Sequence, residues 1–188
     1  MKTGILVGAG HVGKRHAVKM SHIFDNLIII DPDKNALDWC SSNLNLKVTT
    51  YKSIEKAITN EANICEGVCL LANWGVDHSD SFFKLAKENV KKFFIEKPFA
   101  HSLKEIDNIE KFSKENKINV VSGFQLRHSG LADKIKFITA DMLGSSPKLI
   151  SINGGANCIV TNGIHYLDLA CSIFESNPKY VFSLLNKD

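Results

Sequence analysis

Three glycines between residues 8 and 13 restrict this chain more than any other feature of its sequence. Gly8, Gly10 and Gly13 follow a short apolar run in MKTGILVGAGHVGKRH, at the spacing G-x-G-x-x-G. Glycine loses more backbone entropy on folding than any other residue, so three in one window indicate that something approaches the backbone closely. The spacing alone is a weak signal, because a glycine-rich turn that binds nothing has the same pattern. The elements around it decide between these alternatives.

The surrounding pattern alternates strands and helices. Apolar runs bounded by glycine predict strands buried on both faces, and Ser102-x-x-Glu105 predicts a helix that opens with a capping box. Such alternation predicts an α/β fold with a doubly wound parallel sheet of the Rossmann type and right-handed crossovers. The predicted strands are 3–8, 27–31, 47–50, 66–72, 92–95 and 118–123, and the predicted helices are 12–24, 35–43, 53–59, 76–88 and the one from Ser102.

The alternation changes after Gly123. A predicted helix at about 130–142 precedes a strand at 148–153, and a helix at about 163–174 precedes a last strand at 179–185. We therefore expect two domains. Residues 1–123 are the expected dinucleotide-binding domain, and residues 124–188 are expected to form a partial, small α+β domain for substrate and dimerisation.

The three glycines have separate expected roles in binding a dinucleotide. Gly8 permits the tight turn out of the strand, Gly10 lets a pyrophosphate touch the backbone, and Gly13 lets the helix pack closely on the sheet. The helix N-terminus, at His11 and Val12, then offers backbone N–H groups and a partial positive charge to the phosphates. With strand, helix and second strand in order, the glycine spacing becomes a strong signal.

Asp31 ends the second predicted strand, 18 residues after Gly13. A carboxylate there can accept hydrogen bonds from the hydroxyls of the adenosine ribose, and its charge would repel a 2′-phosphate. The position therefore favours NAD over NADP as cofactor. Arg15 is a counter-argument, because a nearby arginine can accommodate that phosphate, so NADP stays possible. The alternative for Asp31 is a solvated acid before a turn.

Composition narrows the remaining classes. The chain has 188 residues, of which 44% are hydrophobic, and 23 basic against 20 acidic side chains give a net charge of +3. Without a dense basic run, nucleic acid is a weak hypothesis, and no apolar run reaches the ~18 residues of a membrane span. We expect no metal site and a cytoplasmic protein. Its five cysteines are expected to be reduced, buried and structural, at positions 40, 65, 69, 158 and 171.

Four stretches together resemble the Gfo/Idh/MocA family. They are GAGHVGKRH, the loop ANWGVDH, the strand-end EKP and the later NGIHYLDLA, and the resemblance covers essentially the whole chain. It implies an NAD(P)-dependent oxidoreductase that acts on a hydroxyl carbon of a sugar, sugar nucleotide or cyclitol. NGIHYLDL also resembles relatives from surface-sugar pathways, which implies a role in surface-polysaccharide biosynthesis.

The resemblance also implies roles for single residues. Lys97 reaches the substrate hydroxyl and is also expected among the cofactor-binding residues, and Glu96 helps to hold the cofactor. The loop after the fourth strand lies near the ribose and nicotinamide of the cofactor, and it supplies Asn73, Trp74 and His78. The substrate-binding residues implied in the second domain are Gln125, Arg127, Thr161 and Asn162.

The chemistry of alcohol oxidation can be assigned from residue types. NAD accepts the hydride, and the protein must supply orientation and a base. His165 is a natural base, Lys97 can stabilise the developing alkoxide, and Asp168 shares a helix face with His165 and could orient it. Trp74 stacks on a ligand or is a buried aromatic residue. The side chains of the other histidines are expected to be solvated or packed, at positions 11, 16, 22, 101 and 128.

Two departures from the family pattern keep other functions open. Family members often carry an aspartate four residues before the histidine, where this chain has Thr161, and they normally continue well past 188 residues. We expect a homo-oligomer, because family members commonly pair through the sheet of the second domain. The alternatives to a dehydrogenase are a non-catalytic NAD(H)-binding sensor or assembly protein, and a lyase or isomerase that uses NAD transiently.

Overall fold

The computed structural model describes residues 2–153 and 162–182. Residues 2–123 form one sheet with helices packed on both of its faces. Within these ranges, six parallel strands form one sheet in the order β3-β2-β1-β4-β5-β6. This is the strand order of a doubly wound dinucleotide-binding sheet, so the predicted α/β fold is confirmed. The strands are β1 (Thr3–Val7), β2 (Asn26–Ile30), β3 (Lys47–Tyr51), β4 (Val68–Leu71), β5 (Lys92–Ile95) and β6 (Asn119–Ser122).

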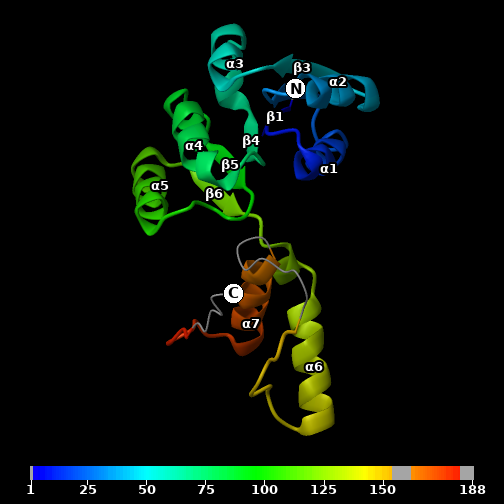
Figure 1. Ribbon diagram of the computed structural model, residues 1–188, viewed down its shortest axis with the longest axis vertical. Helices are drawn as coiled ribbons and strands as arrows, with labels where there is room; N and C mark the ends of the chain where they lie inside the picture. Colours follow the sequence, from blue (N-terminus) through cyan, green and yellow to red (C-terminus); the bar gives the residue numbers. More distant parts are fainter. Residues whose placement is uncertain (1, 154–161, 183–188) are drawn as a thin grey trace, which may run out of the picture. The chain divides into compact units, whose positions relative to one another are not determined.

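The helices follow the predicted alternation (Figure 1). Each strand predicted before residue 124, and each helix predicted with both bounds, begins and ends within four residues of its observed bounds. Short 3-10 turns precede β4 and α4, and another opens the second unit. The helices are α1 (His11–Met20), α2 (Lys34–Asn43), α3 (Ile54–Asn60), α4 (His78–Lys87), α5 (Leu103–Asn116), α6 (Leu131–Leu143) and α7 (Ile164–Phe174), and the 3-10 turns are η1 (Ile64–Glu66), η2 (Gly75–Asp77) and η3 (Gln125–His128).

Successive side chains of β1, β2, β4 and β5 enter two different cores, as the two-residue repeat of a strand predicts. Ile5 and Val7 of β1 pack in a cluster with α3, α4 and α5, whereas Leu6 packs with α1 and α2. Phe82 of α4 is fully buried in the first cluster, and its ring centroid lies 4.8 Å from that of Phe93 in β5. The sheet is therefore covered on both faces, which explains why its strands read as continuous apolar runs.

The chain divides into two compact units, residues 1–123 and 124–188. The helical elements in the described part of the second unit are η3, α6 and α7, which pack on one another. The strand predicted at 148–153 is wrong, and so is the strand predicted from 179 as far as residue 182; its remaining residues lie outside the described ranges. Leu149 is 83% exposed, so an apolar run alone does not make a strand where its backbone groups find no neighbouring strand.

The cysteines are less uniform than predicted. Cys40 and Cys69 are buried, and burial raises the pKa of the Cys69 thiol, as expected for a small structural side chain. Cys65 is exposed, so the prediction that it is buried is wrong. It lies in the 3-10 turn before β4 and not in the strand itself. Cys171 is half-buried on α7, and Cys158 lies outside the described residues.

Candidate functional site

The carboxyl ends of five strands align in one row across the sheet. Val7 pairs with Ile30 on one side and with Leu71 on the other, and Leu71 pairs with Ile95. The residues that follow therefore lie side by side at one edge, and they are, in sheet order, Asp31, Gly8, Ala72, Glu96 and Gly123. Neighbouring strands are about 4.8 Å apart, so the glycine turn and Glu96 are separated by about 10 Å. Ligands of doubly wound sheets bind at this edge.

Two of the three glycines are required by the protein itself. Gly8 has φ +90°, and a Cβ on it would lie 2.4 Å from the backbone nitrogen of Asn73. A Cβ on Gly13 would lie 1.9 Å from the carbonyl oxygen of Gly8, because α1 starts so close to β1. A Cβ on Gly10 would meet no atom of the described residues within 4 Å. The fold does not require Gly10, so the free space above it fits an external group such as a diphosphate.

The N-terminus of α1 fits the same group. Gly10 is its N-cap residue, no side chain of the described residues caps it, and its first turn carries no acidic residue. By contrast, α2, α3 and α5 are capped by Asp33, Ser53 and Ser102. In any α-helix the backbone N–H groups of the first turn, here those at His11 and Val12, have no partner inside the helix. Together with the helix dipole they favour the binding of an anion.

Asp31 organises the glycine turn from the end of β2. Its Oδ2 accepts a hydrogen bond from the backbone N–H of Ala9 at 2.6 Å, and its Oδ1 accepts one from the N–H of Asp33 at 2.8 Å. An ionised carboxylate has about four acceptor positions, so these two bonds leave capacity for ribose hydroxyls. Asp31 is thus more than the solvated acid of the alternative interpretation, and its contact with a cofactor stays a prediction.

The loop after β4 contributes three predicted residues with different surroundings. Trp74 is 81% exposed, which excludes the alternative that it is a buried aromatic residue. Asn73 donates from Nδ2 to Ser81 Oγ at 3.0 Å, while its buried Oδ1 has no partner among the described residues. His78 is 1% exposed, and its ring nitrogens contact the carbonyl oxygens of Pro98 and Asn73. We infer that any effect of His78 on the cofactor is indirect.

Glu96 and Lys97 follow β5 at the same edge, and a histidine joins them. His16 Nε2 lies 2.7 Å from Glu96 Oε1, and Glu96 Oε2 accepts the backbone N–H of Lys97 at 3.1 Å. Burial raises the pKa of Glu96, but the hydrogen bonds from His16 and from Lys97 outweigh it, so the net pKa lies below 4.5, the ordinary value. The carboxylate is therefore ionised at neutral pH.

His16 is one of the histidines predicted to be solvated or packed, and its contact with Glu96 is not among the predictions from sequence. A usable signal was present, since His16 stands three residues after Gly13 on α1. Residues three apart share a helix face, and Gly13 faces the sheet. The partner, Glu96, lies 80 residues away and only the strand order brings it close.

The second unit joins two predicted site residues in one ion pair. Arg127 donates from Nε to both carboxylate oxygens of Asp168, at 3.1 and 3.3 Å, and from Nη2 to Oδ1. The hydrogen bonds that Arg127 donates to Asp168 raise the pKa of Arg127 above its ordinary value. The carboxylate is 9% exposed, so Arg127 compensates a largely buried charge. The predicted roles, substrate binding for Arg127 and catalysis for Asp168, stay predictions.

The other predicted residues of the second unit are placed individually. His165 lies half-buried on α7, with its ring edge-on to that of Phe124 at 6.2 Å between centroids. Gln125 and Asn162 are exposed, and Thr161 lies outside the described residues. Lys97 belongs to the first unit and His165 to the second, so their cooperation stays a prediction.

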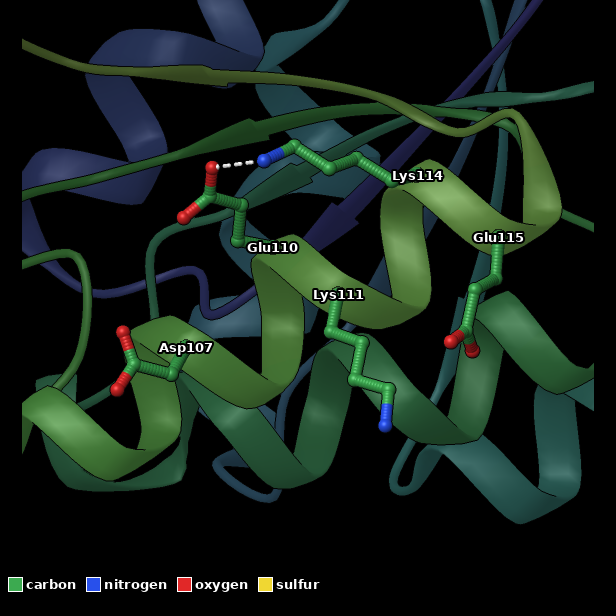
Figure 2. A pocket seen from close by; sticks show the side chains of 5 residues that line it. All are labelled: Asp107, Glu110, Lys111, Lys114 and Glu115. Atoms are coloured by element: carbon green, nitrogen blue, oxygen red, sulfur yellow. Dashed lines mark hydrogen bonds and ion pairs between the residues drawn. The ribbon is translucent and has the colours of Figure 1, made fainter.

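A hollow on α5 is a weaker candidate. Figure 2 shows its five charged side chains, all projecting from one helix, with Glu110 and Lys114 paired at 2.5 Å. Pairs four residues apart on an exposed helix are typical of a solvated face. None of the residues predicted for cofactor or substrate lines it, so the site is assigned to the carboxyl edge of the sheet.

The family assignment rests on the match between a family model and the first unit of the chain. The family described as an oxidoreductase family with an NAD-binding Rossmann fold, GFO_IDH_MocA, matches residues 2–124. The chain belongs to the Gfo/Idh/MocA oxidoreductase family. The match covers the glycine turn, Asp31 and the Glu96-Lys97-Pro98 segment, so this unit of the Gfo/Idh/MocA chain is an NAD-binding domain.

Several solved structures similar to this Gfo/Idh/MocA chain are dehydrogenases. Myo-inositol 2-dehydrogenase from Lactobacillus plantarum is 21% identical with a TM-score of 0.72, and the match covers 92% of this chain and 56% of that one. Scyllo-inositol dehydrogenase from Lactobacillus casei, with bound NAD(H) and scyllo-inositol, is 14% identical with a TM-score of 0.69 and the same coverage. These likenesses confirm the fold, and the chain spans about 56% of the length of these relatives.

A third similar structure is also a dehydrogenase. The WlbA (WbpB) dehydrogenase from Thermus thermophilus, in complex with NAD and alpha-ketoglutarate, is 18% identical with a TM-score of 0.70, and the match covers 92% of this chain and 62% of that one. No curated protein matches the chain. Over residues 2–153 and 162–182, no helix is long and apolar enough to span a membrane.

Proposed function

We propose that this Gfo/Idh/MocA protein transfers a hydride between NAD(H) and a hydroxyl carbon of a sugar, sugar nucleotide or cyclitol in the cytoplasm. The observation that carries the proposal is the alignment of the Gly10 turn, Asp31 and Lys97 at one edge of the sheet. The cofactor-binding turn and a cationic side chain are thus about two strands apart. A small carbohydrate at Lys97 would therefore lie next to a cofactor that is held at the turn.

The roles of the residues follow from their chemistry. Gly10 and the N-terminus of α1 hold the diphosphate, and Asp31 accepts the hydroxyls of the adenosine ribose. When bound, NAD supplies the hydride acceptor. Lys97 stabilises the charge that develops on the substrate oxygen, and His165 takes or returns the proton. Asp168, held by Arg127, keeps α7 and therefore His165 in place.

The second unit completes the proposal. Gln125, Arg127, Thr161 and Asn162 belong to the segments proposed to line the substrate pocket. The chemistry of similar proteins supports a polyhydroxylated substrate, because two inositol dehydrogenases share the fold. A place in surface-polysaccharide biosynthesis and a homo-oligomer are further parts of the proposal. The carboxylate of Asp31 favours NAD, because its charge would repel the 2′-phosphate of NADP, which is the weaker alternative.

One observation, the threonine at position 161, favours a second function. Thr161 stands four residues before His165, where the family resemblance implies an aspartate, and threonine cannot accept a proton as a carboxylate does. A non-catalytic NAD(H)-binding protein of the same fold would bind the cofactor without turnover. A lyase or isomerase would consume its substrate without net change in NADH.

The test combines binding and turnover in one series. NAD and NADP are titrated by calorimetry, and the protein is then assayed for NADH with cyclitols, free sugars and nucleotide sugars, while substrate loss is followed by mass spectrometry. We expect Lys97→Met to bind NAD within about 3-fold of wild type and to lose about 10² to 10⁴-fold in rate, the range of a general acid–base group. Lys97→Arg is the matched control that keeps a charge. NAD binding without loss of any substrate would favour the non-catalytic function.

A further inference from the structure

The imidazoles of His16 and His78 contact the two residues that flank Lys97, the proposed catalytic lysine. We propose that His16 and His78 are positioning residues for Lys97, which hold Glu96 and Pro98 on either side of it and so fix its backbone at the edge of the sheet. The inference rests on the proposed function of Lys97. It concerns the first unit only, where all five residues lie.

The first contact comes from α1. His16 Nε2 lies 2.7 Å from Glu96 Oε1, and the side chains are only 25% and 14% exposed. The Phe94 ring packs beside the imidazole at 5.8 Å between centroids. An ionised carboxylate only accepts hydrogen bonds, so His16 must donate from Nε2. Bonds of this charged kind are about twice as strong as neutral ones.

The same carboxylate reaches the backbone of Lys97. Its second oxygen, Oε2, accepts the Lys97 N–H at 3.1 Å. A Cβ placed on Gly123 would lie 3.3 Å from Glu96 Cδ, so the end of β6 packs closely against this carboxylate. Glu96 therefore has little room to turn, and it passes the restraint from His16 to Lys97.

The second contact comes from α4. His78 Nδ1 lies 2.9 Å from the carbonyl oxygen of Pro98, and Nε2 lies 3.2 Å from that of Asn73. The ring is buried, and a Cβ on Gly75 would lie 2.7 Å from Pro98 Cγ. Pro98 is thus held against the loop after β4, on the far side of Lys97 from Glu96.

These contacts act where the sheet no longer holds the chain. The backbone bond from Glu96 N to Leu71 O, at 2.9 Å, continues the ladder one residue past β5. Lys97 comes next, and its N–H is donated to the Glu96 carboxylate. A lysine has a long side chain, so a small shift of its backbone moves the ammonium by a large distance. Holding both neighbours pre-organises it for one reacting oxygen.

Amide hydrogen exchange of Lys97, measured by NMR on the full chain without ligand, tests the proposal. In His16→Leu we expect protection of the Lys97 amide to fall by about 10-fold, the value of one charged hydrogen bond. His16→Gln, whose Nε2 can still donate, should restore it to within about 3-fold. His22→Leu is the matched control, because His22 is an exposed histidine just beyond α1. The amide of Ile5, in the core of β1, reports global opening.

The role of His78 is tested by the same measurement, the hydrogen exchange of the Lys97 amide. His78→Asn keeps a donor near the Nδ1 position and should preserve the protection of Lys97, whereas His78→Leu should lower it about 10-fold. Should His78→Leu fail to fold, the His16 series and His78→Asn still decide. Unchanged Lys97 protection in His16→Leu, or a loss shared equally by Ile5, would overturn the proposal. Calorimetry with NAD separates this failure from failure of the proposed function, because the exchange experiment needs no cofactor.

Discussion

His16 and Glu96 are 80 residues apart in the chain and 2.7 Å apart between Nε2 and Oε1. The contact joins the helix that follows the glycine turn to the strand-end segment that carries Lys97. A proposed phosphate-binding end and a proposed catalytic segment are thus linked by one hydrogen bond. The glycine turn, Asp31 and Glu96 can each be tested by substitutions whose effects differ in kind.

Gly10 and Gly13 should respond differently to a side chain. We expect Gly10→Val to abolish NAD binding and to leave the melting temperature nearly unchanged, because its Cβ enters free space. Gly13→Ala should destabilise the protein by about 3 kcal/mol or more, because its Cβ would lie 1.9 Å from Gly8 O. Calorimetry and thermal unfolding measure the two effects. If Gly10→Val still binds NAD, the diphosphate is misplaced.

Asp31 should control both affinity and cofactor choice. We expect Asp31→Asn to weaken NAD binding by about 10-fold and to raise the ratio of NADP to NAD affinity, because the repelling charge is removed. Asp33→Asn is the control, since Asp33 caps α2 through Asn35 N at 2.9 Å and asparagine caps equally well. Titrations of both variants with both cofactors provide the measurement. Equal effects of the two substitutions would argue against a ribose contact of Asp31.

The lowered pKa of Glu96 predicts a pH dependence of stability. The folded pKa lies below the ordinary value of 4.5, so the unfolded chain binds the proton more readily. The contribution of Glu96 is therefore fully present above about pH 4.5 and is lost as the pH falls through the lower folded pKa. The free energy of unfolding of wild type minus that of Glu96→Gln should shrink over this window.

The free energies of unfolding of wild type and Glu96→Gln are compared because other carboxylates also titrate in this pH range. The hydrogen bond from Lys84 is the main cause that lowers the pKa of Glu55 to about 2, and this effect is common to both proteins. Urea unfolding at several pH values from 7 downwards gives the difference. A constant difference throughout would show that Glu96 is not stabilised in its ionised form.

The Arg127–Asp168 pair should stabilise the second unit. We expect Arg127→Met to cost about 1–3 kcal/mol, because it leaves a carboxylate that is 9% exposed without its donor. Arg127→Met together with Asp168→Asn should cost less than the sum of the two single changes. The control is Glu175→Gln at the more exposed pair with Lys136, expected to cost under about 0.5 kcal/mol. A double-mutant cycle by denaturant unfolding measures both, and additive effects at the first pair would contradict the prediction.

Much of the first unit could be predicted from local patterns. The apolar runs at 3–8 and 27–31 with glycines between them predicted β1, the turn and β2, because these signals depend on neighbours within a few residues. The same rules failed at 148–153, where the apolar residues find no strand to pair with among the described residues. A strand depends on a partner elsewhere in the chain, whereas a helix satisfies its own backbone.

The sequence by itself determined the glycine turn, the order of elements and the candidates Asp31, Glu96 and Lys97, since these follow from short-range spacing and backbone sterics. Only the tertiary structure decided that His16 bonds to Glu96, that His78 is buried between two carbonyls, and that Arg127 compensates Asp168. Such pairs depend on which strands become neighbours and on the register between them. That choice results from burial summed over the whole sheet, and no local spacing in the sequence reports it.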